Sequence, residues 1–274
     1  MQIITPVNAR ILRLQGVIKT MKSLKLRVFF EQFSLTDALR FLWSKTNQRL
    51  FDPHNFSSYA QTGEDRIIGH LLASETVGES GFYVDVGCNH PQVFSNTFSL
   101  YQRGWRGITV DANEELVRSH QKLRQRDTSI CAVVSNNTQE VVFTEFEDSL
   151  VSSLSKNHID EWKEKRKIKK QRTVKPIALT TLLKENSAPK SFDLLSIDVE
   201  GHDFEVLSSL DLDFYRPRLI MIEMHGFDIT NPTASNIYTY LSAHRYKMIG
   251  YAVMNGYFVS MTEPLPHSRR NSFA

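Results

Sequence analysis

The sequence lacks long hydrophobic runs and has little cysteine. Its longest apolar pieces are short, such as residues 219–222, whereas a helix that crosses a bilayer needs about 20 apolar residues. Arg10 and Arg13 interrupt the apolar stretch that a secretory signal would require. Two cysteines, Cys88 and Cys131, cannot alone build a disulfide framework or a zinc cage. We therefore expect a protein of a reducing, cytoplasmic compartment.

Net charge is also small, with 33 Lys+Arg against 30 Asp+Glu and a formal charge of +3. That average hides two basic segments. Residues 1–30 hold six basic and no acidic side chains, and residues 163–175 hold eight basic side chains and Glu164. The segments carry +6 and +7 and the whole chain +3, which leaves −10 for the other 231 residues. The sequence therefore describes an acidic body with two basic segments.

The 274 residues suffice for one large domain with an appendage. Apolar side chains spaced by three and four predict a helix over residues 3–30, with most basic side chains off the apolar stripe. Three interpretations of this helix stay open: docking to the body or a second subunit, peripheral contact with an anionic membrane, or organelle targeting. We expect a helical extension and linker over residues 1–56, the main domain over 57–262 and a polar tail over 263–274.

Short β-rich runs alternate with helical pieces from Gly81 onward. The strand candidates are Phe82–Val86, Gly107–Asp111, Ser129–Val134, Val141–Phe146, Arg172–Ile177, Phe192–Asp198 and Arg218–Met224. The helix candidates are Gln92–Arg103, Glu114–Arg124, Leu179–Lys184, Phe204–Ser209 and Thr233–Ala243. Two last β runs, 246–253 and 257–261, meet at Asn255-Gly256, a strong hairpin signal. This order predicts an α/β fold of the class I methyltransferase, Rossmann-like type: a mostly parallel seven-stranded sheet ending in an antiparallel hairpin.

The turn after the first strand is the first candidate for a cofactor site. Gly87 is followed by residues 88–91 of sequence Cys-Asn-His-Pro, so the Gly-x-Gly-x-x-Gly pattern of a dinucleotide site is missing. S-adenosylmethionine has no phosphate and needs one close backbone approach and an acid. Asp111 ends the next strand, 24 residues after Gly87, where a carboxylate can bind a ribose diol. Capping of the helix that starts near Glu114 is the alternative role for Asp111. Ser135 follows the third strand, where an adenine would lie.

Acids and histidines follow the fourth and fifth strand candidates, at Asp198, Glu200, His202, Asp203, Glu223 and His225. Transfer of a methyl group to a hydroxyl needs a base or a metal close to the acceptor oxygen. We expect Glu200, His202, Glu223 and His225 to serve the reaction, although helix capping for Glu200 and a surface position for His202 stay open. If the strand continues, alternation directs Asp198 and Glu200 to one face, where they could share a proton, bind substrate or hold a metal. No complete ligand set is visible, so no metal is predicted.

An ordered set of motifs resembles the FkbM family of S-adenosylmethionine-dependent methyltransferases. The motifs are Tyr-Ala-Gln-Thr-Gly-Glu-Asp at 59–65, Val-Asp-Val-Gly at 84–87, Phe-Ser-Asn-Thr at 94–97, Gly-Trp-Arg-Gly at 104–107 and Ile-Asp-Val-Glu-Gly-His at 197–202. The resemblance covers residues 57–260 and implies a class I fold and O-methylation of a sugar or other hydroxyl, in a natural-product or surface-polysaccharide pathway. Many members have a second small residue where this chain has His90-Pro91, which we interpret as a change of pocket shape.

The resemblance also implies that Gln61 and Glu64 reach the cofactor from a helix before the first strand. Together with the strand-end residues, the expected S-adenosylmethionine contacts are Gln61, Glu64, Asp85, Gly87, Asn89, Asp111, Ser135 and Asp198. Two other classes stay open: an N- or carboxyl-methyltransferase acting on a small metabolite or protein, and a non-catalytic scaffold that keeps the fold.

The basic segment 163–175 has two interpretations, a solvated helix face or flexible insertion, and a contact surface for an anionic acceptor such as a phosphorylated glycan. Nucleic acid is not an expected partner, because no aromatic side chains interleave with the basic ones as stacking platforms. We expect a small-molecule or glycan acceptor, and membrane contact or self-association through residues 1–30.

Overall fold

The computed structural model describes residues 58–72, 80–137, 139–146, 165, 167–263 and 265. The helix expected over residues 3–30 lies outside these residues, as does most of the expected tail. None of the helices in the described ranges has the length and apolar character needed to cross a bilayer.

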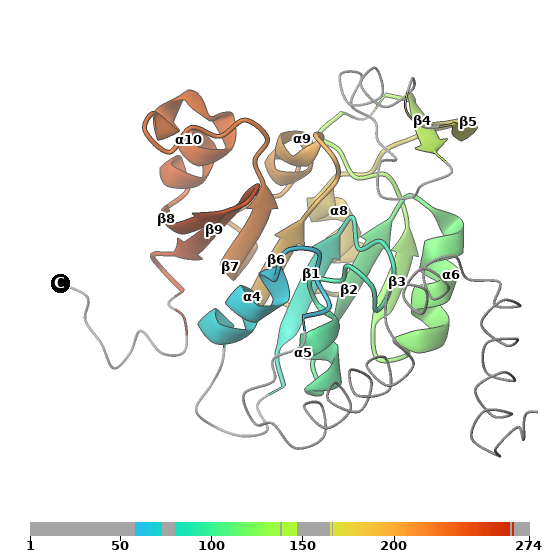
Figure 1. Ribbon diagram of the computed structural model, residues 1–274, viewed down its shortest axis with the longest axis horizontal. Helices are drawn as coiled ribbons and strands as arrows, with labels where there is room; N and C mark the ends of the chain where they lie inside the picture. The colour runs from blue at the N-terminus through green and yellow to red at the C-terminus, as the bar shows by residue number, and fades with distance from the viewer. Residues whose placement is uncertain are drawn as a thin grey trace, which may run out of the picture. The chain divides into compact units, whose positions relative to one another are not determined.

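A seven-stranded sheet forms the centre of the described domain (Figure 1). Its strands are β1 (Phe82–Val86), β2 (Arg106–Asp111), β3 (Thr128–Cys131), β6 (Ser191–Ile197), β7 (Arg216–Glu223), β8 (Tyr246–Ala252) and β9 (Asn255–Ser260). They lie in the order β3-β2-β1-β6-β7-β9-β8. The first five in this order are parallel, and β9 runs antiparallel to both β7 and β8. The expected mostly parallel sheet with an antiparallel end is therefore confirmed.

Helices cover both faces of the sheet, because successive strand side chains point to opposite sides. In β1, Tyr83 packs with α4 (Glu64–Leu72) and α5 (Phe98–Gln102). Its neighbour Val84 packs in the opposite cluster, with α8 (Leu179–Glu185), α9 (Asp203–Ser208) and α10 (Asn236–Ala243). The helix α6 (Glu114–Leu123) lies beside β2 and β3. Burial on both faces explains the nearly continuous apolar runs of the central strands.

The helix predicted over residues 92–103 is wrong in its first half, since α5 begins at Phe98. The backbone nitrogens of residues 92 and 93 donate to His90 Nδ1 at 3.2 and 3.1 Å, which closes a local turn. Phe94 then has a φ of 57°, and helical hydrogen bonding cannot continue through that conformation. Pro91 therefore belongs to a turn and not to a first helical turn.

The hairpin prediction is right in its pairing and wrong in its turn. Val253 and Met254 connect β8 to β9, and Val253 has a φ of 57°. Asn255 and Gly256 lie inside β9, where Asn255 is opposite Glu223 of β7. A β-carbon on Gly256 would lie 2.5 Å from the Met224 sulfur, so close packing explains this glycine.

Two predicted strands do not belong to the main sheet. The strands β4 (Val141–Phe146) and β5 (Ile168–Val174) form a separate antiparallel pair. Residues 168–174 of the basic segment are thus a strand, so the alternative of a helix face is wrong for these residues. Two of its side chains pair with acids elsewhere, Lys169 with Glu115 at 2.9 Å and Arg172 with Glu145 at 3.0 Å.

The other boundaries shift by a few residues. The strand expected over 129–134 ends at Cys131, and Val134 forms an isolated bridge to Ile177. The last helix begins at Asn236, because Ser235 caps it by accepting from the Tyr238 backbone nitrogen. The residues before it form the 3-10 turn η2 (Pro232–Ala234).

Candidate active site

The carboxyl ends of β1, β2, β6 and β7 meet at one edge of the sheet, the position at which open α/β sheets bind ligands. Gly87 follows β1 there with a φ of +81°. A β-carbon at this position would meet the Asp198 carbonyl carbon at 2.7 Å and the Val199 Cγ1 at 3.1 Å. The chain after β6 therefore occupies the space that the missing side chain leaves. The need for glycine comes from two strand ends packed against each other.

Asp111 ends β2 and organises both adjacent turns. Its Oδ2 accepts from the Asn89 backbone nitrogen at 3.0 Å and its Oδ1 from the Asn113 backbone nitrogen at 2.7 Å. Desolvation raises the pKa of Asp111 to about 6, against these two hydrogen bonds. The cap of α6 is the Asn113 side chain, which accepts from the Glu115 backbone nitrogen at 2.9 Å. The alternative that Asp111 caps this helix is therefore wrong.

A buried histidine that the sequence did not single out holds the turn after β1. His120 of α6 has no solvent exposure, and its Nε2 lies 3.0 Å from the Asn89 carbonyl oxygen. Burial lowers the pKa of His120 to about 4, so the ring is neutral at physiological pH. Val117, His120 and Arg124 follow at spacings of three and four, and that pattern marks the inner side of the helix.

Arg124 connects this region to β1 through buried polar contacts. Its Nη2 donates to the Tyr83 hydroxyl at 2.6 Å and to Thr97 Oγ1 at 2.9 Å. Thr97 in turn donates to Asp85 Oδ2 at 2.6 Å, and burial raises the pKa of Asp85. Asp127 pairs with the Arg124 Nε at 2.8 Å. Asp85 is therefore oriented by a buried network in which Thr97 belongs to a motif found in the sequence, whereas Arg124 and Asp127 were not singled out there.

Ser135 and His202 lie together. Ser135 is buried, and its Oγ lies 3.0 Å from His202 Nε2. On the other side of the ring, His202 Nδ1 lies 3.6 Å from the Glu205 carboxylate. Desolvation lowers the pKa of His202. The structure thus places this histidine with the residue expected beside adenine, where its side chain contacts Ser135 and Glu205.

Glu64, at the start of α4, reaches the far end of the sheet. Its Oε2 accepts from the Thr62 backbone nitrogen at 2.9 Å, and its Oε1 accepts from Asn255 Nδ2 at 3.3 Å. Because Asn255 is opposite Glu223 in the β7–β9 pair, this contact brings α4 to the end of β7. Gln61 is exposed at the edge of the domain.

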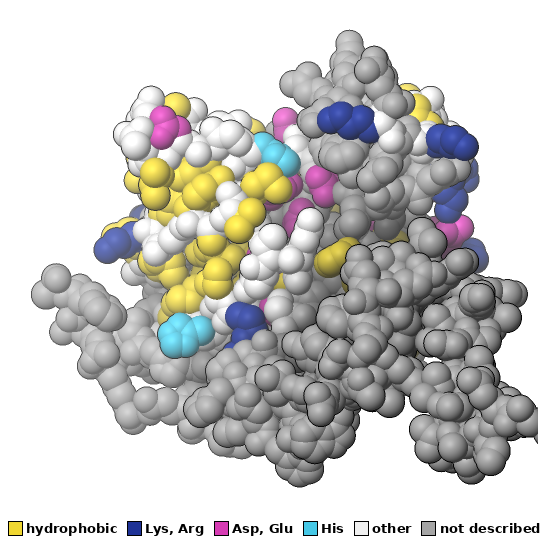
Figure 2. Space-filling model, in the orientation of Figure 1, with side chains coloured by type: hydrophobic (Ala, Val, Ile, Leu, Met, Phe, Trp, Pro, Cys, Tyr) yellow, Lys and Arg dark blue, Asp and Glu magenta, His cyan; other side chains and the backbone are white. Residues whose placement is uncertain are grey.

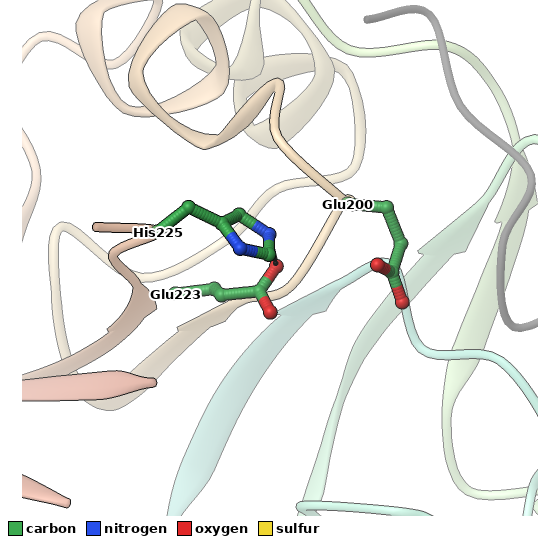
Figure 3. Close-up of side chains that lie close together, drawn as sticks. All are labelled: Glu200, Glu223 and His225. Atoms are coloured by element: carbon green, nitrogen blue, oxygen red, sulfur yellow. Dashed lines mark ion pairs between the residues drawn. The ribbon is translucent and has the colours of Figure 1, made fainter. Parts of the chain in front are cut away.

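Glu200, Glu223 and His225 converge at the ends of β6 and β7 (Figure 3). One ligand atom from each lies within 4.8 Å of the others, and His225 Nε2 is 3.0 Å from Glu223 Oε2. We call these three residues the strand-end cluster. In the space-filling view, acidic side chains and a histidine gather near the centre of the face, beside a hydrophobic area (Figure 2).

The loop after β6 brings Glu200 into the strand-end cluster. The strand ends at Ile197, and Glu200 adopts a φ of 54°, so the alternation considered for Asp198 and Glu200 does not apply. Asp203 fixes this loop, because its carboxylate accepts from the backbone nitrogens of Val199 and Gly201, both at 3.0 Å. A non-glycine residue in the left-handed region costs about 1–3 kcal/mol, and such conformations concentrate at functional sites.

The carboxylates around the strand-end cluster raise one another's pKa. Desolvation, followed by the charge of Glu223, raises the pKa of Asp198 well above its usual range and that of Asp203 to about 7. The contact with Glu223 raises the pKa of His225 to about 9. The edge between β6 and β7 therefore concentrates desolvated carboxyl groups, and within the strand-end cluster His225 is the cationic partner of Glu223.

This strand order, with an acid at the end of β2 and reactive side chains after β6 and β7, defines a class I methyltransferase fold. The methyltransferase FkbM domain model matches residues 85–248. The chain belongs to the FkbM methyltransferase family.

Among similar solved structures, one matches over 82% of this chain and 99% of its own, with 10% identity and a TM-score of 0.37. It is a TehB-like SAM-dependent methyltransferase from Corynebacterium glutamicum ATCC 13032 Kitasato. No curated protein matches the chain significantly.

Proposed function

We propose that the protein transfers a methyl group from S-adenosylmethionine to a hydroxyl of a saccharide or a related metabolite. The observation that carries this proposal is the convergence of Glu200, Glu223 and His225 beside the chain that packs on Gly87. In this arrangement the β1 and β2 ends hold the cofactor, and the β6 and β7 ends hold the acceptor.

The polar groups at the β1 and β2 ends fit the cofactor. Each Asp111 oxygen accepts one backbone hydrogen bond, which leaves a lone pair on each oxygen for one hydroxyl of a ribose diol. Ser135 and His202 would contact the adenine, and Asp85, Asn89 and Asp198 lie close to the turn at Gly87. Glu64 would reach the amino-acid end from α4, with Gln61 at the rim.

The strand-end cluster supplies the chemistry at the acceptor. S-adenosylmethionine, when bound, supplies an electrophilic methyl group on a sulfonium sulfur. Glu200 or Glu223 accepts the proton of the acceptor hydroxyl, whose oxygen bonds to the methyl carbon as the carbon–sulfur bond breaks and S-adenosylhomocysteine is left. His225 orients the Glu223 carboxylate through their 3.0 Å contact.

Two measurements test this proposal. Calorimetry with S-adenosylhomocysteine should show one site per chain, and the absence of binding would refute cofactor use. Radiolabelled S-adenosylmethionine, incubated with panels of glycans and hydroxylated metabolites, should then give a base-stable methyl ether. A base-labile methyl ester would instead identify a carboxyl acceptor, and binding without any transfer would favour a scaffold.

A further inference from the structure

We propose that the strand-end cluster of Glu200, Glu223 and His225 is a binding site for a first-row divalent cation such as Mn²⁺. The evidence for this site is the arrangement of the three side chains. Its role, to hold and acidify the acceptor hydroxyl, rests on the proposed function.

The distances suit one ion. Ligand atoms from the three side chains lie within 4.8 Å of one another, and they come from two chain segments, the loop after β6 and the end of β7 (Figure 3). Opposite ligands of an ion with bond lengths of about 2.1 Å lie about 4.2 Å apart. Shifts of a few tenths of an ångström would therefore close the site. Glu200 is held there by its left-handed backbone, with Asp203 supporting the loop on both sides.

A buried oxygen beside Glu223 lacks a donor, which is an independent indication of a ligand. The Glu223 side chain is 7% exposed, and apart from His225 no hydrogen-bond partner in the described part of the chain reaches its Oε2. Asn255 is 7% exposed, and its Oδ1 likewise has no partner among the described residues. The two residues are directly opposite in the β7–β9 pair, so their side chains lie on the same face. A buried oxygen without a partner is costly, and a cation held by Glu223 would also offer a partner to the Asn255 oxygen.

The surrounding charge favours a cation as well. Asp198 and Asp203 interact electrostatically with Glu223; Asp198 lies in the loop that carries Glu200, and Asp203 begins α9 directly after it. A single histidine, itself 43% exposed, cannot offset this many carboxylates in a partly desolvated place. A divalent ion would be the largest local charge and would stabilise all of them together.

The ligand types restrict the choice of ion. Imidazole with carboxylates suits Mn²⁺, Fe²⁺ or Zn²⁺ better than Ca²⁺, which prefers oxygen ligands alone. Three protein ligands leave coordination positions for the acceptor oxygen. A bound ion would withdraw electron density from that oxygen, so that its proton passes more readily to the Glu200 or Glu223 oxygen that does not bind the ion before the oxygen bonds to the methyl carbon. The ion keeps its oxidation state throughout.

Manganese binding can be measured without any turnover. The full chain is dialysed against a chelator and titrated with MnCl₂ while the electron paramagnetic resonance signal of free Mn²⁺ is followed, with and without S-adenosylhomocysteine. We expect one bound Mn²⁺ per chain. Spin-echo modulation from a directly coordinated nitrogen should be present in the wild type and lost in His225→Gln.

The variants Glu223→Gln and Glu200→Gln should each bind Mn²⁺ at least tenfold more weakly than the wild type. Glu115→Gln and His70→Gln are matched controls, because both residues are exposed and lie on α6 and α4, outside the strand-end cluster. Circular dichroism and S-adenosylhomocysteine affinity verify that each variant is folded, and Glu200→Gln at the partly exposed loop keeps the test valid if Glu223→Gln fails to fold.

The site is supported if the wild type binds one Mn²⁺ per chain, the cluster variants bind it more weakly and the control variants bind it as the wild type does. Absence of a bound ion under both cofactor conditions overturns it, as does binding that all three cluster variants leave unchanged. Because S-adenosylhomocysteine affinity is measured separately, a protein that binds the cofactor and no Mn²⁺ refutes the metal site and leaves the proposed methyl transfer intact.

Discussion

The backbone carbonyl of Asp198 lies where a side chain on Gly87 would begin, so the ends of β1 and β6 are in direct backbone contact. This contact fixes the turn expected to hold the cofactor against the loop that carries Glu200. The proposed cofactor and acceptor sides of the site are therefore joined by backbone packing.

Replacing Gly87 with alanine should destabilise the protein by about 3 kcal/mol or more, because backbone strain and overpacking add. Gly104→Ala is the matched control, since Gly104 also has a positive φ, +96°, but open space at its β-carbon position. That variant should lose only about 1–2 kcal/mol. Urea denaturation measures both. Equal losses would show that the contact with Asp198 adds nothing to the strain.

Removing the Arg124 guanidinium should cost about 3–5 kcal/mol, because Asp127 would be left as a buried charge without its partner. We expect Arg124→Met also to weaken S-adenosylhomocysteine binding, since Thr97 and Asp85 lose their support. Arg118→Met removes an exposed pair with Glu114 and should cost less than about 1 kcal/mol. Denaturation and calorimetry check both effects, and a fully stable Arg124→Met protein would contradict the role of the network.

His120 should make the protein less stable in acid. Its folded pKa, about 4, lies below the unfolded value near 6.5, so the unfolded chain binds the proton first as the pH falls. The contribution of this residue is retained above pH 6.5 and decreases by about 3 kcal/mol as the pH falls to 4.

Comparison of wild type with His120→Gln isolates this effect from Asp111, whose raised pKa acts in the opposite direction. Urea denaturation at pH 7 and pH 5 should show a smaller pH dependence in the variant. A variant with the wild-type pH dependence would show that the buried ring is not the titrating group.

Asp111→Asn should weaken S-adenosylhomocysteine binding about tenfold or more, because a carboxylate accepts ribose hydrogen bonds more strongly than an amide. In the wild type, affinity should fall as the pH drops below about 6, where the carboxylate becomes protonated. Calorimetry at pH 7.5 and 5 tests both points, with Glu115→Gln as the control. If Asp111→Asn binds like the wild type, the ribose is held elsewhere.

Deletion of residues 1–30 should leave S-adenosylhomocysteine affinity unchanged, because the expected cofactor contacts all lie after residue 60. The loss of six basic side chains should reduce sedimentation with anionic vesicles or change the oligomeric state. Vesicle sedimentation and light scattering test the two alternatives. If neither property changes, membrane contact and self-association through this segment are both excluded.

The sequence by itself determined most of the main sheet. Residues 82–86 form a strand at the predicted bounds, and α6 begins at the predicted Glu114, because apolar runs and helical periodicity are local signals. The motifs also placed acids at the ends of β2, β6 and β7. Each of these features depends on neighbours within a few residues, so a linear pattern can carry it.

Only the tertiary structure decided which distant residues these side chains and strands contact. It removed β4 and β5 from the main sheet, moved the hairpin turn to Val253 and placed His202 with Ser135. It also joined Glu200 to Glu223 and His225, more than 20 residues later in the chain. Such contacts depend on strand order and on a left-handed backbone at Glu200, and neither is encoded in the spacing of the residues themselves.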